Sequence, residues 1–399
     1  MRPIYLDNNA TTRTDQAVVA AMLPYFVDQF GNASSTHAFG AEVANALKEA
    51  RGKLRQLLGA AFDHEIVFTS GGTESDNAAI LSAIETQAGR DEIVTTSVEH
   101  PAILNLVEHL EKARGIKVHL IGVDSRGCLD IDAYRSALGP RTAIASVMWA
   151  NNETGTIFPV EQLAKMAHGV GALFHTDAVQ AVGKIPIDLK TTEIDMLSLS
   201  GHKLHGPKGI GALYIRKGVK FSPLIRGGHQ ERRRRGGTEN VPGIIGLGKA
   251  AELSIANLEE ERTRIRALRD RLEQGVMQRI DHCLVNGDDQ NRLPNTSNIA
   301  FEYLEGEAVL LHMDRAGIAA STGSACTAGS TEPSHVLCAM NLPSTALRGA
   351  IRLSFSRENT SDDVDRVLDV LPGIIAKLRA LSPAWLEREA ALKRLELCH

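Results

Sequence analysis

The sequence predicts an α/β protein whose mostly parallel sheet is covered by helices on both faces, followed by a smaller α+β domain. Two observations lead to this fold class. From about residue 15 to about residue 250, short β-branched runs alternate with helical patterns, as in a parallel sheet with crossover helices. After about residue 250 the pattern changes to a long charged helix, short strands and a mainly helical end.

The individual elements follow from the spacing of apolar residues. Strands of the large domain are expected at 66–69, 93–96, 117–121, 142–148, 172–175 and 196–200. Between them, apolar residues recur at helical spacing, as in 43–58 and 102–110, and these stripes should face the core. In the smaller domain we expect strands at 297–302 and 350–355. A helix is expected over 360–380, capped by Thr360 and kinked or interrupted by Pro372.

Composition excludes several classes of protein. The chain has 399 residues, and its 44 Lys and Arg against 48 Asp and Glu give a net charge of −4, which excludes a strongly basic nucleic-acid binder. Apolar runs are far shorter than the roughly 20 residues of a membrane-spanning helix. Asp7 stands where a signal peptide would be apolar. We therefore expect a cytoplasmic protein without membrane or nucleic-acid partners.

The cysteine pattern indicates one reactive thiol rather than a set of disulfide bonds. Their number is odd and they are scattered without a C-x-x-C pair, which fits neither disulfides nor a zinc site, and no metal site is expected. Cys326 lies in the small, polar stretch 321–330, where a buried structural cysteine would be unusual, so we interpret it as a nucleophile. The others are expected to be structural: Cys128, Cys283, Cys338 and Cys398.

A glycine-rich turn after the first predicted strand is a candidate anion site. Residues 70–75 follow that strand and open a helix, so the backbone N–H groups near Gly72 and the hydroxyl of Thr73 meet at the positive end of the helix dipole. The alternative is an ordinary turn in which Thr73 is the N-cap. No lysine follows the glycines, so the segment is not a Walker loop.

Two further strand ends carry a lysine and a histidine. Lys203 follows a strand and is flanked by Ser200 and His202 rather than by carboxylates, so it can reach a bound molecule and form a Schiff base. A solvated loop lysine is the alternative. The ring of His100 can stack on a flat cofactor or transfer protons, although a lone histidine is more often structural.

An acid, an amide and an arginine complete the candidate set. Asp177 can pair with a protonated pyridine nitrogen while Gln180 donates to a phenolic oxygen, although Asp177 alone would more often be a helix cap. Arg352 stands in an apolar strand and needs an anion, which is either a substrate carboxylate or an internal ion-pair partner. The run 232–235 of four arginines is interpreted as a solvated loop, with an acidic partner or a phosphate as alternatives. A phosphate cup, an acid, a lysine and a flat ring at separate strand ends fit pyridoxal phosphate better than NAD or ATP.

Taken in order, these motifs resemble the cysteine desulfurases of the class V aminotransferase group. The resemblance is carried by residues 5–12 (YLDNNATT), 70–77 (SGGTESDN), 98–101 (VEHP), 149–155 (WANNETG), 175–180 (HTDAVQ), 200–203 (SGHK), 226–240 and 321–330. Within the group, residues 147–156 and 292–301 are most similar to the nitrogenase-associated NifS branch.

The resemblance implies a fold type I homodimer that binds pyridoxal 5′-phosphate. It implies a large cofactor-binding domain over 15–255, with a sheet of seven strands, and a small domain formed by 1–14 and 256–399. Lys203 would hold the cofactor, His100 would stack on its ring, Asp177 would pair with the ring nitrogen, and Gln180 would contact the ring oxygen. The phosphate would be held by Gly72, Thr73, Ser200 and His202, and Thr238 would reach the phosphate of the neighbouring subunit. Asn152 and Arg352 would bind the substrate carboxylate.

The implied reaction converts L-cysteine to L-alanine and leaves the sulfur on Cys326 as a persulfide. The sulfur would pass to an iron–sulfur scaffold or another acceptor protein, for example in nitrogenase assembly. Two alternatives use the same fold for other substrates, a selenocysteine lyase and an aminotransferase. A third is a non-catalytic sulfur-relay scaffold, which would need neither Lys203 nor Cys326.

Overall fold

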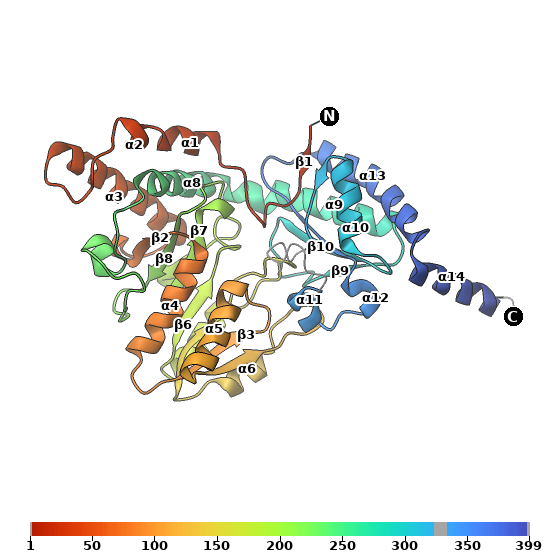
Figure 1. The fold of residues 1–399 in the computed structure, drawn as a ribbon, viewed down its shortest axis with the longest axis horizontal. Coiled ribbons are helices and arrows are strands. Elements are labelled where there is room, and N and C mark those ends of the chain that lie inside the picture. The colour runs from red at the N-terminus through yellow and green to blue at the C-terminus, as the bar shows by residue number, and fades with distance from the viewer. Residues whose placement is uncertain (1, 323–332, 397–399) are drawn as a thin grey trace.

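A seven-stranded, mostly parallel sheet forms the centre of the larger part of the molecule (Figure 1). The computed structural model describes residues 2–322 and 333–396. The sheet has the order β2 (Ile66–Thr69), β8 (Gly211–Ile215), β7 (Met196–Ser200), β6 (Leu173–Asp177), β5 (Thr142–Ser146), β3 (Glu92–Thr96), β4 (Lys117–Ile121). β8 is antiparallel to both of its neighbours, and the other pairs are parallel. The predicted fold class is confirmed, and the six predicted strands end within two residues of the observed ones.

The sequence pattern does not predict β8. The strand begins with Gly211 and Ala212, two residue types that are depleted in strands, so the composition gives only a weak strand signal here. Gly211 opens the strand where it passes the glycine-rich turn. A Cβ atom on Gly211 would lie 2.7 Å from the Cα of Gly71, so only glycine allows this approach.

Helices cover the two faces of this sheet because its strand residues alternate between two hydrophobic cores. Val67 packs in the core formed with α4 (Gly72–Thr86) and α5 (Pro101–Arg114). Its neighbours Ile66 and Phe68 point the other way, into the core formed with α3, α7 and α8. The remaining helices of this part are α1 (Gln16–Met22), α2 (Pro24–Val27), α3 (Ala38–Leu58), α6 (Ile131–Ala137), α7 (Val160–Gly169) and α8 (Val241–Glu260).

A third core belongs to the smaller part, at the right of Figure 1. An antiparallel sheet in the order β12 (Ala350–Ser354), β10 (Thr296–Phe301), β9 (Cys283–Asn286) packs against helices α9 (Arg266–Arg279), α10 (Gly306–Arg315) and α13 (Ser361–Arg379). Ile4 and Leu6 belong to this same core, and β1 (Ile4–Tyr5) pairs with β11 (Ile318–Ala319). This packing supports a small domain formed by 1–14 and 256–399, although the exact boundaries stay a prediction.

The segment between the two parts is one long helical run with a π-helical turn. α8 is followed directly by the π-helix at Glu261–Ile265 and then by α9. The short helices α11 (His335–Ala339) and α12 (Ser344–Leu347) lie close to the junction, and α14 (Pro383–Glu396) extends away from the body (Figure 1). Within the described residues, none of the helices combines the length and apolarity needed to cross a membrane.

The interruption expected as one possibility at Pro372 does not occur, and α13 continues from Ser361 to Arg379. Proline cannot donate a hydrogen bond to the carbonyl four residues earlier, which is that of Leu368. The guanidinium of Arg279, on α9, donates to the Leu368 carbonyl instead, at 2.8 Å. At the start of the helix Thr360 forms the predicted cap, reinforced by Asp363 in a capping box.

The guanidinium of Arg279 replaces the N–H that Pro372 lacks as the donor to the Leu368 carbonyl, so mutations of Arg279 and Pro372 should have coupled effects on stability. Arg279→Leu should lower the free energy of unfolding by about 1–2 kcal/mol, because it leaves a helix carbonyl without its donor. In a P372A background the restored backbone N–H serves that carbonyl, so Arg279→Leu should cost clearly less. Chemical denaturation of the four proteins measures the coupling, with Arg266→Leu on the same helix as control. Equal costs in both backgrounds would contradict this account.

Candidate active site

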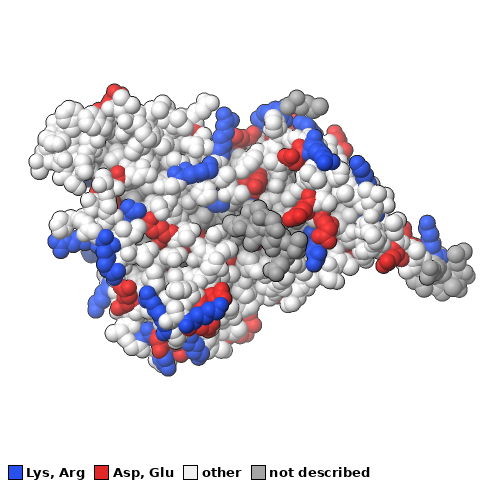
Figure 2. Space-filling view, viewed as in Figure 1, with Lys and Arg blue, Asp and Glu red and all other residues white. Residues whose placement is uncertain are grey.

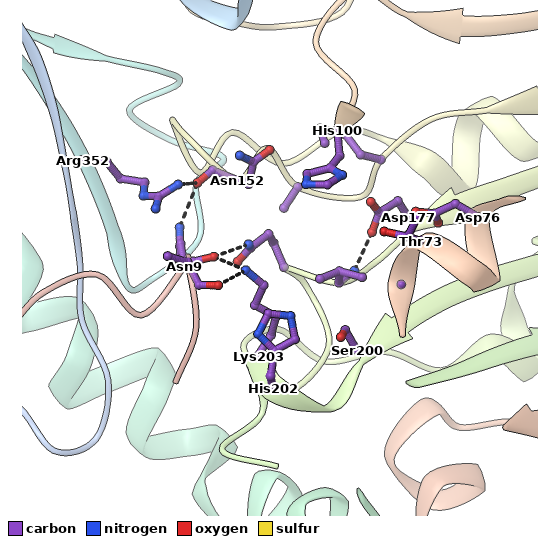
Figure 3. Close-up of a pocket in the computed structure, with 16 residues that line it drawn as sticks. Asn9, Thr73, Asp76, His100, Asn152, Asp177, Ser200, His202, Lys203 and Arg352 are labelled. Carbon is purple, nitrogen blue, oxygen red and sulfur yellow. Dashed lines mark hydrogen bonds between the residues drawn. The ribbon is translucent and has the colours of Figure 1, made fainter. Parts of the chain in front are cut away.

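A cavity of about 410 Å³ lies at the carboxyl ends of the parallel strands, where the larger and smaller parts meet. It is lined by Asn9, Ala10, Gly72, Thr73, Asp76, His100, Met148, Ala150, Asn152, Asp177, Val179, Gln180, Ser200, His202, Lys203 and Arg352. In Figure 3, Arg352 and Asn152 lie on one side of His100 and Lys203, and Asp177 and Thr73 on the other. The tertiary structure therefore brings together ten of the twelve predicted site residues.

The glycine-rich turn forms an anion cup at the start of α4. Gly71 is the N-cap of this helix and has no side chain to occupy the first turn, so the predicted alternative of Thr73 as N-cap is wrong. A Cβ atom on Gly72 would lie 2.8 Å from Cγ2 of Val179, so only glycine lets Val179 pack against this turn. Ser200, at the end of β7, also lies against Gly72, and His202 lines the same cavity.

Lys203 ends a 3-10 turn, Gly201–Lys203, directly after β7. Its Nζ donates hydrogen bonds to the backbone carbonyl of Ala10, at 2.7 Å, and to that of Asn9. The alternative of a solvated loop lysine is therefore wrong, because the amine points into the cavity and is held by the N-terminal segment (Figure 3).

Asp177 and His100 face the same cavity from different strand ends. Asp177 ends β6, and one of its carboxylate oxygens accepts the N–H of Val179 at 2.9 Å. Residues 178–183 form hydrogen-bonded turns rather than the expected helix. His100 caps α5 through Nδ1, which accepts the N–H of Ala102 at 3.1 Å, so the structural alternative also holds for this residue. Burial raises the pKa of Asp177 and lowers the pKa of His100. The charge of His100 opposes the shift of Asp177, and the charge of Asp177 opposes the shift of His100.

A buried polar network lies behind Asp177. His175 is fully buried and bonds Ser146 and Ser198 through its two ring nitrogens, each at 2.9 Å. Burial lowers its pKa to about 3, so the ring is neutral. Asp76 also lines the cavity, with Oδ1 3.7 Å from Nε2 of His175. Burial, and then the charge of Asp177, raise the pKa of Asp76 well above its usual range.

Arg352 is held at the opposite end of the cavity by a protein carboxylate. Its guanidinium donates to Asp7 at 2.7 Å and to the backbone carbonyl of Asn152 at 3.0 Å. The alternative of an internal ion pair is thus correct, yet Arg352 also lines the cavity and so faces any ligand there. The backbone of Arg352 pairs with Ser321, the start of the segment that carries Cys326.

Two predicted site residues are not among those that line the cavity. Thr238 is exposed, on the loop before α8. Cys326 lies outside the described residues, between Thr322 and Pro333. Both described ends of its segment border the site: beyond it, Ser334 donates to the buried carboxylate of Glu153 and His335 bonds the carbonyl of Glu99, next to His100.

Sequence reasoning did not identify Asn9 or Asp76 as site residues. Asp76 lies three positions after Thr73 on α4, and helical spacing alone would have placed both on one face. Asn9 has no such local signal, because its role depends on packing between distant segments.

The arginine run is anchored as well as solvated. Arg235 pairs with Glu74 at 2.9 Å, and Arg234 donates to the carbonyl of His64. Arg232 and Arg233 are exposed, as the solvated alternative predicts.

Comparison with known proteins gives a consistent result. The model of the aminotransferase class-V family matches residues 4–367. The chain is 74% identical over 385 residues to a cysteine desulfurase of Gluconacetobacter diazotrophicus, covering 96% of each chain. It is 58% identical to the cysteine desulfurase NifS of Azotobacter vinelandii, again over 96% of each. Among solved structures, a NifS-like protein superposes with a TM-score of 0.88 at 38% identity, covering 94% of this chain and 100% of that one.

The neutral state of His175 predicts how stability depends on pH. An imidazole in the unfolded chain binds a proton near its ordinary pKa of 6.5, whereas in the folded protein this pKa is about 3. His175 therefore contributes full stability above pH 6.5, and loses it as the pH falls toward 3. Between pH 5.5 and 4, the unfolding free energy of the wild type should fall more steeply than that of His175→Gln, by about 1.4 kcal/mol per pH unit.

Urea denaturation at several pH values tests this, with the same substitution at the exposed His109 as control. Equal slopes for the wild type and H175Q would show that the ring is protonated in the folded state.

Proposed function

Because the chain belongs to the class V aminotransferase family, we propose that it is a pyridoxal phosphate-dependent cysteine desulfurase that converts L-cysteine to L-alanine. The observation that carries the proposal is the single cavity that holds a lysine amine, an anion cup, a buried carboxylate, an imidazole and an arginine. The cysteine desulfurases at 74% and 58% identity support the same activity and substrate.

The residues present fit pyridoxal 5′-phosphate, the cofactor of this family. The turn carries no side chain of its own at Gly71 and Gly72, which suits the phosphate, and the neutral His202 in the same cavity can accept or donate a hydrogen bond. Burial and the neighbouring Lys203 lower the pKa of His202 to about 4. When bound, the cofactor supplies an electron sink for the charge left when a proton leaves Cα of the amino acid. Asp177 would hold the proton on the ring nitrogen, and His100 would stack on the ring.

Lys203 would first hold the cofactor and then move the Cα proton. Its amine lies between the Asn9 and Ala10 carbonyls and the cavity, so substrate binding only has to displace it locally. The guanidinium of Arg352, with Asn152, would bind the substrate carboxylate in bidentate fashion. Asp7 already holds this guanidinium at 2.7 Å, which keeps it oriented before substrate arrives.

Cys326 would take the sulfur. Its thiolate forms a bond to the substrate sulfur as the substrate Cβ–S bond breaks, and the electron pair of that bond stays with carbon, which is protonated to give L-alanine. Ser321 is anchored beside Arg352, which lines the cavity, and Cys326 follows Ser321 by five residues of chain. Thr322 stands where the family usually has serine, a chemically mild difference.

The persulfide would then be delivered to an acceptor protein. We propose that it supplies iron–sulfur cluster assembly for nitrogenase, which the likeness to the NifS of Azotobacter vinelandii supports. A cytoplasmic location agrees with the free thiols of Cys128, Cys283 and Cys338.

A homodimer is supported by an apolar patch formed by Leu23, Phe26, Val27, Phe30 and Phe39. These side chains are between 56% and 73% exposed, and Figure 2 shows few charges over this region, at its upper left. Exposed apolar patches of this kind mark protein interfaces. Thr238 precedes α8, the helix that packs against α1 and α3, so a partner bound at the patch would lie near this loop. Thr238 would then contribute to the partner's phosphate site.

The activity is tested by measuring L-alanine and sulfide formed from L-cysteine with a thiol reductant present. Wild-type protein should produce the two in equal amounts. Lys203→Ala should reduce turnover at least about a thousandfold, because general acid–base transfer and cofactor attachment are both lost. Cys326→Ala should retain the cofactor but lose the protein persulfide, and Cys338→Ala serves as the matched control. Sulfide release by C326A at the wild-type rate would refute the nucleophile, and a cofactor-loaded wild type without alanine would refute the substrate.

The dimer is tested by sedimentation of patch variants. Val27→Asp with Phe30→Asp should produce monomers and weaken cofactor retention, because a buried unpaired charge destabilises an apolar interface. Leu386→Asp, at an exposed apolar position on α14, should leave the mass unchanged. A wild-type monomer would contradict the assignment of the patch.

A further inference from the structure

The orientation of the Gln180 side chain is determined by a buried lysine. Lys184 lies four residues after Gln180, in the hydrogen-bonded turns that follow β6, and its Nζ donates to Oε1 of Gln180 at 2.9 Å. The other end of the amide, Nε2, donates to the carbonyl of Asn9 at 3.1 Å and lines the cavity. An ammonium group can only donate, so it selects the oxygen end of the amide and turns the nitrogen toward the site.

Lys184 is only 7% exposed, which is unusual for a lysine. It is brought inward by the hydrogen-bonded turns after β6, where Gly183 adopts a left-handed conformation with φ of 76°. A Cβ atom on Gly183 would lie 2.8 Å from Cδ2 of Leu204, so the turn needs glycine to pack this closely. The chain thus builds a specific backbone conformation around a cation that is costly to bury.

A carboxylate faces this cation from the junction of the two parts of the molecule. Glu261 is the first residue of the π-helical turn between α8 and α9, and its Oε2 is enclosed without a hydrogen-bond donor among the described residues. π-Turns inside helices are rare and are frequent at functional sites. A small polar cavity of about 30 Å³, large enough for one water molecule, is lined by Lys184, Glu261 and Lys203.

The electrostatics of the pair agree with this arrangement. Burial lowers the pKa of Lys184 to about 7, and the charge of Glu261 opposes that shift. Burial raises the pKa of Glu261 to about 7, and the charge of Lys184 opposes it in turn. Each group therefore favours the charged form of the other, and the loss of Glu261 would favour the neutral amine, which can also accept a hydrogen bond.

We propose that Lys184 is a positioning residue whose ammonium, which shares a small buried cavity with Glu261 of the π-turn, orients Gln180 with its nitrogen toward the ring oxygen of the cofactor. The proposal rests on the proposed function, because it needs pyridoxal phosphate in the cavity. It links the cofactor contact to the junction between α8 and α9, the point where the larger part of the chain continues into the smaller one.

The test is a double-mutant cycle on the holoenzyme, read by the visible absorption band of the bound cofactor and by its rate of loss after dilution into a scavenger. Lys184→Met should shift the band and accelerate cofactor loss about tenfold, the effect of weakening one hydrogen bond to a charged oxygen. Gln180→Ala should do the same. The double variant K184M/Q180A should lose the cofactor no faster than Q180A alone, because Lys184 acts through the amide. Glu261→Gln should change the band in the same direction by a smaller amount.

Controls separate positioning from folding and from the proposed function. Lys190→Met removes a lysine whose side chain is 56% exposed and should change neither readout. If K184M does not fold, a second cycle with E261Q and Q180A still tests the proposal. In that cycle E261Q should shift the absorption band of the wild type but not the band of Q180A. Additive effects of K184M and Q180A on cofactor loss, or no effect of E261Q, would overturn the positioning role of Lys184. If the wild type binds the cofactor in that case, the proposed function still stands. A wild type that retains no cofactor would overturn both.

Discussion

The backbone and side chain of Asn9 hold together the parts of the molecule that form the cavity. Its carbonyl accepts hydrogen bonds from Lys203 and Gln180, both in turns that directly follow strands of the large sheet. Its side chain bonds Thr296 and Asn295, and its N–H donates to Ser354, all in the smaller part. Asn9 is 1% exposed, and buried polar groups must find partners within the protein. The relative position of the two parts is therefore set by the same bonds that place the lysine amine.

Burial of unlike charges at opposite sides of one cavity is the second organising feature. Asp177 and Asp76 lie on one side and Arg352 on the other, with Lys203 between them (Figure 3). Arg352 is paired with Asp7. In such a site charges interact more strongly than in water, and each needs a fixed partner. A zwitterionic amino acid bound to a cofactor with an anionic phosphate and a cationic ring would match this distribution. The same principle explains the neutral His175 and His202, whose pKa values burial lowers.

Most elements could be predicted from local pattern, and the exceptions have identifiable causes. Strands with β-branched residues and helices with apolar stripes are specified by their own residues, so β2 to β7 and α3 to α5 agree with the structure. β8 was missed because it begins with glycine and alanine, which are depleted in strands. Pro372 was expected to disturb α13, but Arg279, far away in the sequence, supplies the donor that the Leu368 carbonyl would otherwise lack. Prediction from local sequence fails where a residue far away in the chain supplies a hydrogen-bond donor that the helix itself lacks.

The sequence by itself determined the fold class, the order of strands and loops, and the residue types at each strand end, because these depend on short-range periodicity and on the motifs. It therefore identified Lys203, His100, Asp177 and the cup at Gly72 before any coordinates. Only the tertiary structure decided that Arg352 is already paired with Asp7, that Asp76 faces the cavity, and that Asn9 joins the two parts. It also decided that Lys184 is buried against Gln180 while Glu261 enters from a π-turn. These features depend on which distant side chains meet in a low-dielectric interior, and no local pattern encodes such contacts.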